Sequence, residues 1–311
     1  MSILVCGSVA YDTIMVFPDR FRNHILPEQL HILSVSFLVP EMRKEFGGCA
    51  GNIAYNLRLL GDAPQIMATV GDDAGPYLAR LDTLGLARDH VRTVAETFTA
   101  QAFITTDLED NQINAFHPGA MNYAHLNRID EASGVKIGVV APDGREGMVA
   151  HAAQFAQAGI PFLFDPGQGL PMFEGDELRE FLKLATWCAV NDYEARLLSE
   201  RTGLSLEEIA AGLQGLVVTL GAQGSRVYAN GEVIDVASAP ATEVVDPTGC
   251  GDAYRAGLLF GLARDYDWLR CARLGAVMGA FKIAHRGGQN HAPTRDEIAA
   301  LYRNTFDGEP W

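Results

Sequence analysis

The sequence has few cysteines and no long apolar run. Its 311 residues include five cysteines, and none of them form a C-x-x-C pair. Scattered thiols argue against a disulfide framework or a structural zinc site and favour a reducing compartment. No apolar stretch approaches the ~18 residues that a membrane span requires. The first residues, MSILVCGS, lack the basic region of a signal peptide, so we expect a cytoplasmic protein.

The sequence is also short of positive charge. Lys and Arg number 24 against 39 Asp and Glu, which gives a formal net charge of -15. An acidic surface repels a phosphate backbone, so we expect neither nucleic acid nor a membrane as a partner. A negatively charged ligand must instead be held by a local device, such as a helix N-terminus or a metal ion.

Apolar runs alternate with amphipathic stretches along much of the chain. Strands are predicted at 3–6, 136–141, 161–165 and 216–220, and helices at 51–60, 147–158 and 176–185. This order predicts an α/β fold with a doubly wound, mostly parallel sheet flanked by helices. Two stretches, at about 13–46 and 97–118, alternate with period two instead, as in Leu30–Val39. We expect these insertions to form a small β-sheet lid on a single domain, 1–311.

The segment DPTGCGDAYRAG (246–257) is the most informative part of the sequence. A strand-like TEVV precedes it, a turn of small residues follows, and a helix is predicted from about Cys250. Glycines let the backbone present N–H groups, and a helix N-terminus attracts phosphate. Asp252, in the first helical turn, could take a proton from an attacking hydroxyl during phosphoryl transfer. Alternatively, it only complements the helix dipole.

Other nucleotide and hydrolase motifs are absent. The sequence has no G-x-x-x-x-G-K-[ST], no H-E-x-x-H and no G-x-S-x-G. Gly249 and Gly251 begin a G-x-G, but Tyr254 stands where the dinucleotide fingerprint needs its third glycine. Phosphate binding without a P-loop narrows the range of candidate protein families.

Two further segments suggest a hydroxylated ligand. GGCAGN (47–52) opens a predicted helix, where paired glycines allow close approach and Asn52 offers both a donor and an acceptor. Asp12 follows the first strand, and ligands of doubly wound sheets bind at the carboxyl ends of strands. Its carboxylate would suit a vicinal diol. The alternatives are a turn-capping Asp and a glycine pair that permits helix packing.

Together these segments resemble the ribokinase (PfkB-type) family of sugar and nucleoside kinases. The resemblance rests on Asp12, GGCAGNIAYNLRLLG (47–61), the N-x-x-E motif Asn191-Asp192-Tyr193-Glu194, and DPTGCGDAYRAG, in the family's order. It implies a ribokinase-like fold and transfer of the γ-phosphoryl group of ATP to a primary hydroxyl.

The resemblance also implies roles for individual residues. Asp252 is implied as the base, and the N–H groups of Gly249, Cys250 and Gly251 as the anion hole. The other implied ATP contacts are Asn191, Thr219, Gly221 and Gly224, with residues 285–291 near the adenine. Glu194 would help to place Mg²⁺ through water. Asp246 adjoins the position where the family often uses a monovalent cation such as K⁺.

Within the family, the sequence looks most like bacterial adenosine kinases and related nucleoside kinases. The supporting stretches are Phe17–Val39, Ala115–Met121, Asp165–Leu170 and Asp252–Gly257. They imply phosphorylation of the 5′-hydroxyl of a purine nucleoside such as adenosine, as in purine salvage. The implied acceptor residues are Ser8, Asp12, Gly48 and Asn52 for the ribose, and Ser36, Gln168, Phe103 and Phe116 for the purine.

Several interpretations stay open from the sequence. Phe103 and Phe116 could stack on a purine or pack within the lid. Arg255 could pair with a ligand phosphate or with a structural carboxylate. The histidines lack ligand spacing, and we interpret His117, His151, His285 and His291 as surface or hydrogen-bonded residues. Exposed lid edges favour a homodimer joined through the lid. A free-sugar kinase and a non-catalytic nucleoside-binding protein are the alternative functions.

Overall fold

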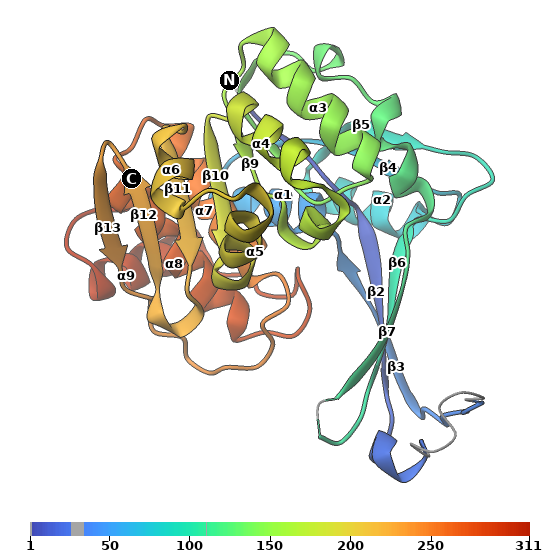
Figure 1. The fold of residues 1–311 in the computed structure, drawn as a ribbon. Coiled ribbons are helices and arrows are strands. Elements are labelled where there is room, and N and C mark those ends of the chain that lie inside the picture. The colour runs from blue at the N-terminus through green and yellow to red at the C-terminus, as the bar shows by residue number, and fades with distance from the viewer. Residues whose placement is uncertain (1, 26–33, 110) are drawn as a thin grey trace.

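The computed structural model describes residues 2–25, 34–109 and 111–311. It contains two β-sheets, one central and one that projects from the body of the molecule (Figure 1). The 9-stranded sheet has the order β13-β12-β11-β10-β9-β8-β1-β4-β5, and the 4-stranded sheet has the order β3-β2-β6-β7. The predicted α/β fold with a separate small sheet is therefore confirmed.

The inner strands of the large sheet are short apolar runs, as strands buried on both faces require. Its parallel strands are β1 (Ser2–Cys6), β4 (Gln65–Val70), β5 (Ala87–Thr93), β8 (Val135–Val140), β9 (Phe162–Phe164), β10 (Trp187–Asn191) and β11 (Gly215–Thr219). A hairpin of β12 (Ser225–Ala229) and β13 (Glu232–Val236) extends one edge in antiparallel fashion. Because the other strands are parallel, their carboxyl ends and the loops that follow them share one edge of the sheet.

Helices cover both faces of the large sheet (Figure 1). One face carries α1 (Cys49–Leu59), α2 (Gly75–Leu84), α7 (Cys250–Leu262), α8 (Trp268–Ile283) and α9 (Arg295–Thr305), and the other carries α3 (Arg145–Ala158), α4 (Gly175–Leu184), α5 (Asp192–Thr202) and α6 (Leu206–Ala211). Side chains alternate along β1, so Ile3 and Val5 join one buried cluster while Leu4 and Cys6 join the other.

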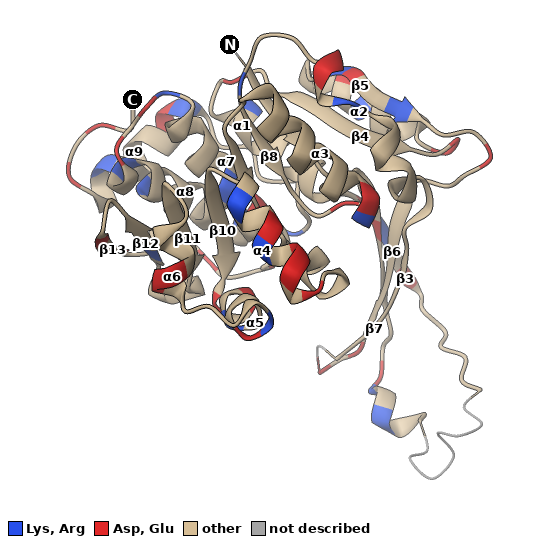
Figure 2. Ribbon diagram, turned by 45° about the horizontal axis from the view of Figure 1, so that its top comes forward, with Lys and Arg blue, Asp and Glu red and all other residues tan. Residues whose placement is uncertain are grey.

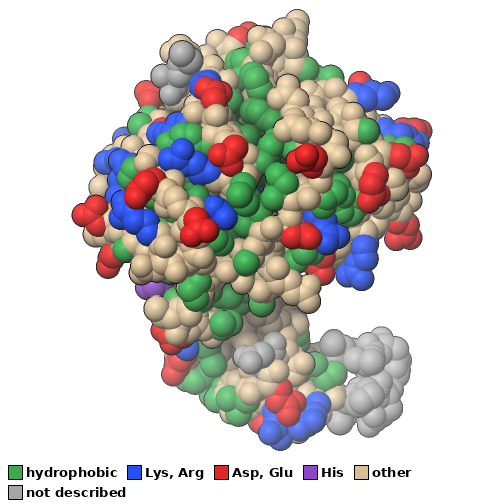
Figure 3. Space-filling model, turned by 90° about the vertical axis from the view of Figure 1, so that its left-hand side faces the viewer, with side chains coloured by type: hydrophobic (Ala, Val, Ile, Leu, Met, Phe, Trp, Pro, Cys, Tyr) green, Lys and Arg blue, Asp and Glu red, His purple; other side chains and the backbone are tan. Residues whose placement is uncertain are grey.

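The small sheet projects from the body, and we refer to it as the lid (Figures 1 and 3). Its strands are β2 (Ala10–Val16), β3 (Glu41–Gly47), β6 (Ala100–Thr106) and β7 (Gln112–His117). The register places Asp12 beside Ala102, and Ala102 beside Phe116, so these three side chains share one face. Phe103, one residue further along β6, lies on the opposite face.

The strand predicted at Leu30–Val39 is wrong for the residues that can be described. Residues 30–33 lie outside the described part, and 34–39 form neither strand nor helix. The ring of Phe37 instead packs with its centroid 4.7 Å from that of Phe17 and 5.0 Å from that of Phe21. Phe37 therefore joins an aromatic cluster at the lid, and residues 34–39 do not add a strand to its sheet.

The strand-like TEVV (242–245) is also not a strand. The N–H groups of Val245 and Asp246 both donate to the Ile283 carbonyl at the end of α8, at 2.9 and 3.1 Å. The segment is therefore anchored to a helix, and this contact sets the position from which the 246–249 turn begins.

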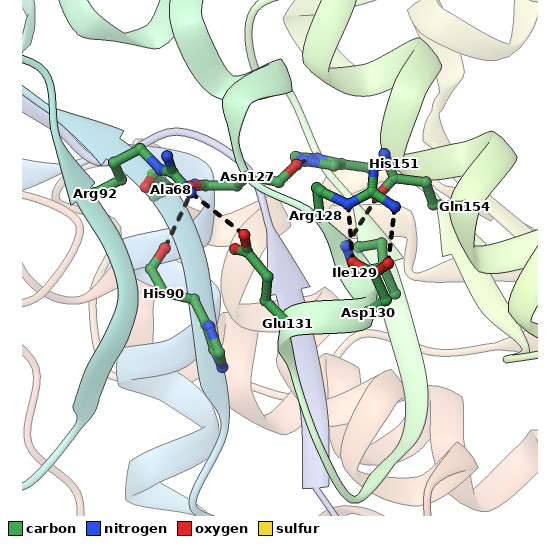
Figure 4. Close-up of polar contacts among 10 residues, drawn as sticks. All are labelled: Ala68, His90, Arg92, Asn127, Arg128, Ile129, Asp130, Glu131, His151 and Gln154. Carbon is green, nitrogen blue, oxygen red and sulfur yellow. Dashed lines mark hydrogen bonds and ion pairs between the residues drawn. The ribbon is translucent and has the colours of Figure 1, made fainter.

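A polar network joins the segment before β8 to the neighbouring strands of the large sheet (Figure 4). Asn127 Nδ2 donates to the Ala68 carbonyl of β4 at 2.8 Å, and Arg92 Nε of β5 donates to Asn127 Oδ1 at 2.8 Å. Nε2 of the buried His151 lies 3.2 Å from the Asn127 carbonyl oxygen. Burial lowers the pKa of His151 to about 4, so it is a neutral, hydrogen-bonded residue, as predicted.

Acidic and basic side chains are interspersed over the surface helices (Figure 2). Within the described ranges, no helix has the length and apolar character needed to cross a membrane. The same ranges hold no cluster of three or more His, Cys, Asp or Glu residues arranged to bind a metal ion.

Candidate active site

The turn before α7 presents backbone N–H groups at the start of the helix. Gly249 has φ of +76°, and a Cβ there would lie 3.2 Å from the Gly288 Cα, so the tight left-handed turn favours glycine. The N–H groups of Gly249 and Gly251 have no acceptor among the described residues. Cys250 differs, because its N–H already donates to the Pro247 carbonyl at 3.1 Å. Two of the three predicted anion-hole donors are therefore free to bind an anion.

Asp252 is the half-buried carboxylate in the first turn of α7. Its Oδ2 accepts a hydrogen bond from Asn52 Nδ2 at 2.9 Å. Burial raises the pKa of Asp252 to about 7, aided by the nearby charge of Asp165 and opposed by Asn52 and Arg255. A carboxylate that titrates near neutrality is matched to general-base chemistry at physiological pH.

A chain of hydrogen bonds fixes the partner of that carboxylate. Gln289 Nε2 donates to Asn52 Oδ1 at 3.2 Å and to the Tyr77 hydroxyl at 2.8 Å. The Tyr77 hydroxyl in turn donates to the carbonyl of Gly47, the last residue of β3, at 2.7 Å. Gln289 belongs to the 285–291 segment that the resemblance placed near adenine. The structure places Gln289 beside Asn52 and Gly287 beside Asp246, and the position of this segment near adenine stays a prediction.

A cavity of about 480 Å³ lies between this carboxylate and the lid. Both the core and the inner lid face contribute to its wall. The predicted residues that line it are Ser8, Asp12, Gly48, Asn52, Phe116, Gln168, Gly249 and Asp252. Burial, together with the charges of Asp246 and Glu45, raises the pKa of Asp12 to about 6. Gly48 has φ of +85°, and a Cβ there would come within 2.5 Å of the Ser8 carbonyl oxygen.

The structure does not bring Ser36 and Phe103 to this cavity. Ser36 is exposed and does not line the wall. Phe103 is 40% exposed on the outer face of the lid, because the register puts Ala102 and Ile104 on the inner face. Phe116 is thus the lid ring that faces the cavity.

Sequence reasoning missed Asp143, which lies under the cavity wall. Its Oδ1 accepts the Gly144 N–H at 2.9 Å, and its Oδ2 has no partner among the described residues. Burial raises the pKa of Asp143 to about 8, so the carboxyl is protonated at neutral pH. Its position in the sequence could have identified it, because Asp143 follows the strand predicted at 136–141 just as Asp12 follows the first strand.

A second cavity of about 400 Å³ lies on the other side of the turn before α7. Of the predicted ATP contacts, Thr219, Gly221, Gly224, Cys250 and Gly251 line it. The remaining wall is mostly small and apolar, and it includes Ala276, Gly279 and Ala280 of α8. The two cavities share no lining residue, and the start of α7 contributes to both.

Asn191 and Glu194 lie at the carboxyl end of β10, next to Thr219 in the register of β11. They form a capping box: Glu194 N donates to Asn191 Oδ1, and Asn191 N donates to Glu194 Oε2, each at 2.8 Å. Glu194 still has a second carboxylate oxygen, which fits the predicted water-mediated contact with Mg²⁺. Neither residue lines the two cavities.

The sequence left open whether Arg255 pairs with a ligand phosphate or with a structural carboxylate. In the structure it pairs with a structural carboxylate. Its Nε and Nη2 donate to Asp165 Oδ2 and Oδ1 at 2.9 and 3.0 Å. Nη2 also donates to the Ala189 carbonyl at 3.2 Å and lies 3.8 Å from Glu194 Oε2. Both members of the pair are buried, so the guanidinium ties α7 to the strands beside it.

Asp246 does not fit the predicted alkali-cation site. Its Oδ1 accepts the Thr248 N–H at 2.9 Å, and its Oδ2 accepts the Gly287 N–H at 2.8 Å. Its carbonyl oxygen accepts a hydrogen bond from Lys282 Nζ at 2.9 Å. An ammonium group therefore already stands where a K⁺ ion would meet that carbonyl.

Known proteins with the same architecture were found by sequence and by structure. The family model for "pfkB family carbohydrate kinase" matches residues 8–295. A structure of Burkholderia thailandensis nucleoside kinase in complex with inosine is 52% identical, with a TM-score of 0.91 over 99% of each chain. The same protein in complex with ADP-inosine is 54% identical, with a TM-score of 0.89 over 99% of this chain and 97% of that one.

A more distant relative agrees with these structures. The nucleoside kinase of Methanocaldococcus jannaschii is 30% identical over 268 residues, which cover 85% of this chain and 88% of that protein. The ribokinase-like fold expected from the sequence is thereby confirmed.

Proposed function

The chain belongs to the pfkB family of carbohydrate kinases, and from that premise we propose that it transfers the γ-phosphoryl group of ATP to the 5′-hydroxyl of a purine nucleoside such as adenosine or inosine. The position of Asp252 carries the proposal. This carboxylate faces a cavity walled in part by the lid, while Cys250 and Gly251, just before it in α7, face a second, apolar cavity. The relatives named nucleoside kinase support the nucleoside as the acceptor.

The lid-side cavity is the proposed acceptor site. Asp12 and Asn52 would hold the ribose hydroxyls, with Ser8 and the Gly48 backbone beside them. Phe116 would stack on the purine, and Gln168 would contact its edge. Closure of the lid over the nucleoside would exclude water, so that ATP is not hydrolysed.

The apolar cavity is the proposed ATP site. Its slot of small side chains on α8 and the Gly221–Gly224 turn would accept the adenine and the ribose of ATP. Asn191 and Glu194 lie at the neighbouring strand end, where Asn191 would contact the phosphates and Glu194 would hold a metal-bound water. Mg²⁺, typical of this family, would neutralise phosphate charge as the reaction proceeds.

The chemistry follows from the groups between the two cavities. Asp252 takes the proton of the 5′-hydroxyl as that oxygen attacks the γ-phosphorus. The bond from the γ-phosphorus to the bridging oxygen breaks, and ADP leaves. The free N–H groups of Gly249 and Gly251 stabilise the charge that develops on the transferred group. The products are nucleoside 5′-monophosphate and ADP.

The lid would also join two copies of the chain. Its outer face exposes Met42 (69%), Phe103 (40%) and Ile113 (43%), and an apolar face on a projecting sheet is suited to burial against its own copy. Phe103→Asp should convert a dimer to a monomer in analytical ultracentrifugation; a wild-type monomer would refute the proposed dimer.

We place the reaction in the cytoplasm, since all five cysteines are free.

An ADP-release assay with magnesium ATP tests the proposed function. It compares adenosine, inosine, guanosine, cytidine, ribose and fructose, and we expect turnover mainly with the purine nucleosides. Turnover with ribose or fructose alone would keep Asp252 as the base but refute the nucleoside site. Binding of nucleosides without turnover would identify a non-catalytic nucleoside-binding protein.

A further inference from the structure

Lys282 carries a fully buried ammonium group next to the proposed phosphate site. The residue lies in the last turn of α8 and is 0% exposed. Its Nζ donates to the carbonyl oxygens of Asp246 and His285, each at 2.9 Å. Among the described residues, no carboxylate oxygen lies within 4.0 Å of Nζ. The charge is therefore held by carbonyl dipoles and not by an ion pair.

Such an arrangement needs a reason, because burying a charge without a close counter-ion is costly. Burial lowers the pKa of Lys282, and the negative charge of nearby Asp246 opposes that shift. Backbone carbonyl oxygens are also the ligands that an alkali cation accepts from a protein. The two carbonyls thus form a cation site that a side chain of the same protein fills.

The site lies directly behind the turn that would bind phosphate. Asp246 begins that turn, and its carboxylate binds the N–H groups of Thr248 and Gly287. A Cβ at Gly249 would lie 3.7 Å from Lys282 Cε, so the lysine stem runs beneath the free N–H groups. The ammonium both fixes the turn and adds positive charge on its far side.

We propose that Lys282 is a built-in cation that positions the phosphate-binding turn and replaces an exchangeable alkali ion. The inference rests on the proposed kinase function and assigns Lys282 a positioning role, since the side chain touches no reacting atom. It predicts that the wild-type protein does not require K⁺. It also predicts that removing the ammonium leaves a vacated site that an alkali cation can enter.

The first test compares kcat of the wild-type protein in potassium, sodium and tetramethylammonium chloride at equal ionic strength. We expect the three rates to agree within about twofold. A kcat that is about tenfold or more higher in K⁺ than in tetramethylammonium would overturn the proposal. An exchangeable ion would then have the role that is assigned to Lys282.

The second test uses Lys282→Met and Lys282→Ala, with Lys136→Met as the matched control on an exposed surface pair with Asp265. Lys282→Met should lower kcat by about tenfold to a hundredfold, with a much smaller change in the KM for the nucleoside. Lys282→Ala should lose activity in tetramethylammonium and regain it in K⁺ or NH₄⁺. Activity of Lys282→Ala equal to wild type in every salt would overturn the proposal.

Thermal unfolding separates this inference from the proposed function, because it needs no turnover. The Tm of Lys282→Ala should rise by about 2 °C or more when K⁺ replaces tetramethylammonium, while wild-type and Lys136→Met should not shift. Absence of turnover in all variants with this shift present would refute the kinase function but keep the cation site. Normal turnover without cation rescue or shift would refute the cation site alone.

Discussion

The two cavities that meet at the start of α7 are built in different ways. The proposed ATP cavity is made by the core alone, from the β11 end, the 238–241 loop and the small side chains of α8. The proposed acceptor cavity combines core residues such as Asn52 and Asp252 with Phe116 and other residues of the lid. The core can therefore keep one phosphate donor while the lid decides which acceptor is admitted.

Burial reflects the same division. The helices around the large sheet pack two continuous apolar clusters, whereas the β7 residues of the lid are all exposed. Figure 3 shows the lid as a separate projection below the body. Rigid elements suit catalytic groups that must hold their geometry, and a thin sheet suits a part that must move to admit a ligand.

The largest effect should come from the group between the two cavities. Asp252→Asn keeps the shape of the side chain but removes the base, so kcat should fall about a thousandfold while both substrates still bind. Steady-state kinetics and isothermal titration calorimetry measure the two outcomes. Asp265→Asn, exposed and remote, is the control. Near-normal turnover of a folded Asp252→Asn protein would show that another group removes the proton.

A pH profile should report on the acceptor cavity alone, because Asp252 and Asp12 both line it. The base acts only when deprotonated, and the pKa of Asp252 is raised to about 7. The kcat/KM for the nucleoside should therefore fall about tenfold per pH unit below 7, or about a hundredfold by pH 5. Asp12, whose pKa is raised to about 6, adds a second step that Asp12→Asn should remove. A profile flat from pH 5 to 8 would contradict the assignment.

The ATP cavity can be filled from the core without touching the lid. Gly279→Leu places a side chain into the slot, and overpacking of about 2 kcal/mol should raise the KM for ATP about thirtyfold. Gly279→Ala is the matched control, because its Cβ would lie 3.9 Å from its nearest neighbour, the Cys250 carbonyl oxygen. An equal rise in the KM for the nucleoside would mean that the cavities are not separate sites.

Substitutions in the lid should have the smallest effect on the kinetics, and the effect should depend on which face of the lid sheet carries the side chain. Phe116→Ala should raise the KM for a purine nucleoside about tenfold by loss of stacking, with the KM for ATP unchanged. Phe103→Ala, on the outer face, should leave the nucleoside KM within about twofold and instead weaken self-association. Equal effects of the two variants on the nucleoside KM would contradict the register argument.

The sequence could predict those site residues whose roles depend only on the local backbone segment that contains them. Asp252 and Gly249 sit in one short segment, so a helix start after glycines already placed them near an anion. Phe103 and Phe116 looked equivalent, because period two gives two faces without saying which face turns inward; the pairing with β2 decides that. Lys282 gave no signal, because its contact with the turn, at the Asp246 carbonyl, joins residues 36 positions apart in the chain. Gln289 lies in the 285–291 segment, but its partners Asn52 and Tyr77 are 237 and 212 positions away, so the sequence did not show its role.

The hydrogen-bond chain from the Gly47 carbonyl through Tyr77, Gln289 and Asn52 to Asp252 has a consequence for how such enzymes diversify. It makes the last residue of a lid strand part of the support of the proposed base, Asp252. A lid transplanted from a relative would therefore not be an independent module. It would transfer acceptor preference without loss of rate only if it also delivered a carbonyl oxygen to the Tyr77 hydroxyl.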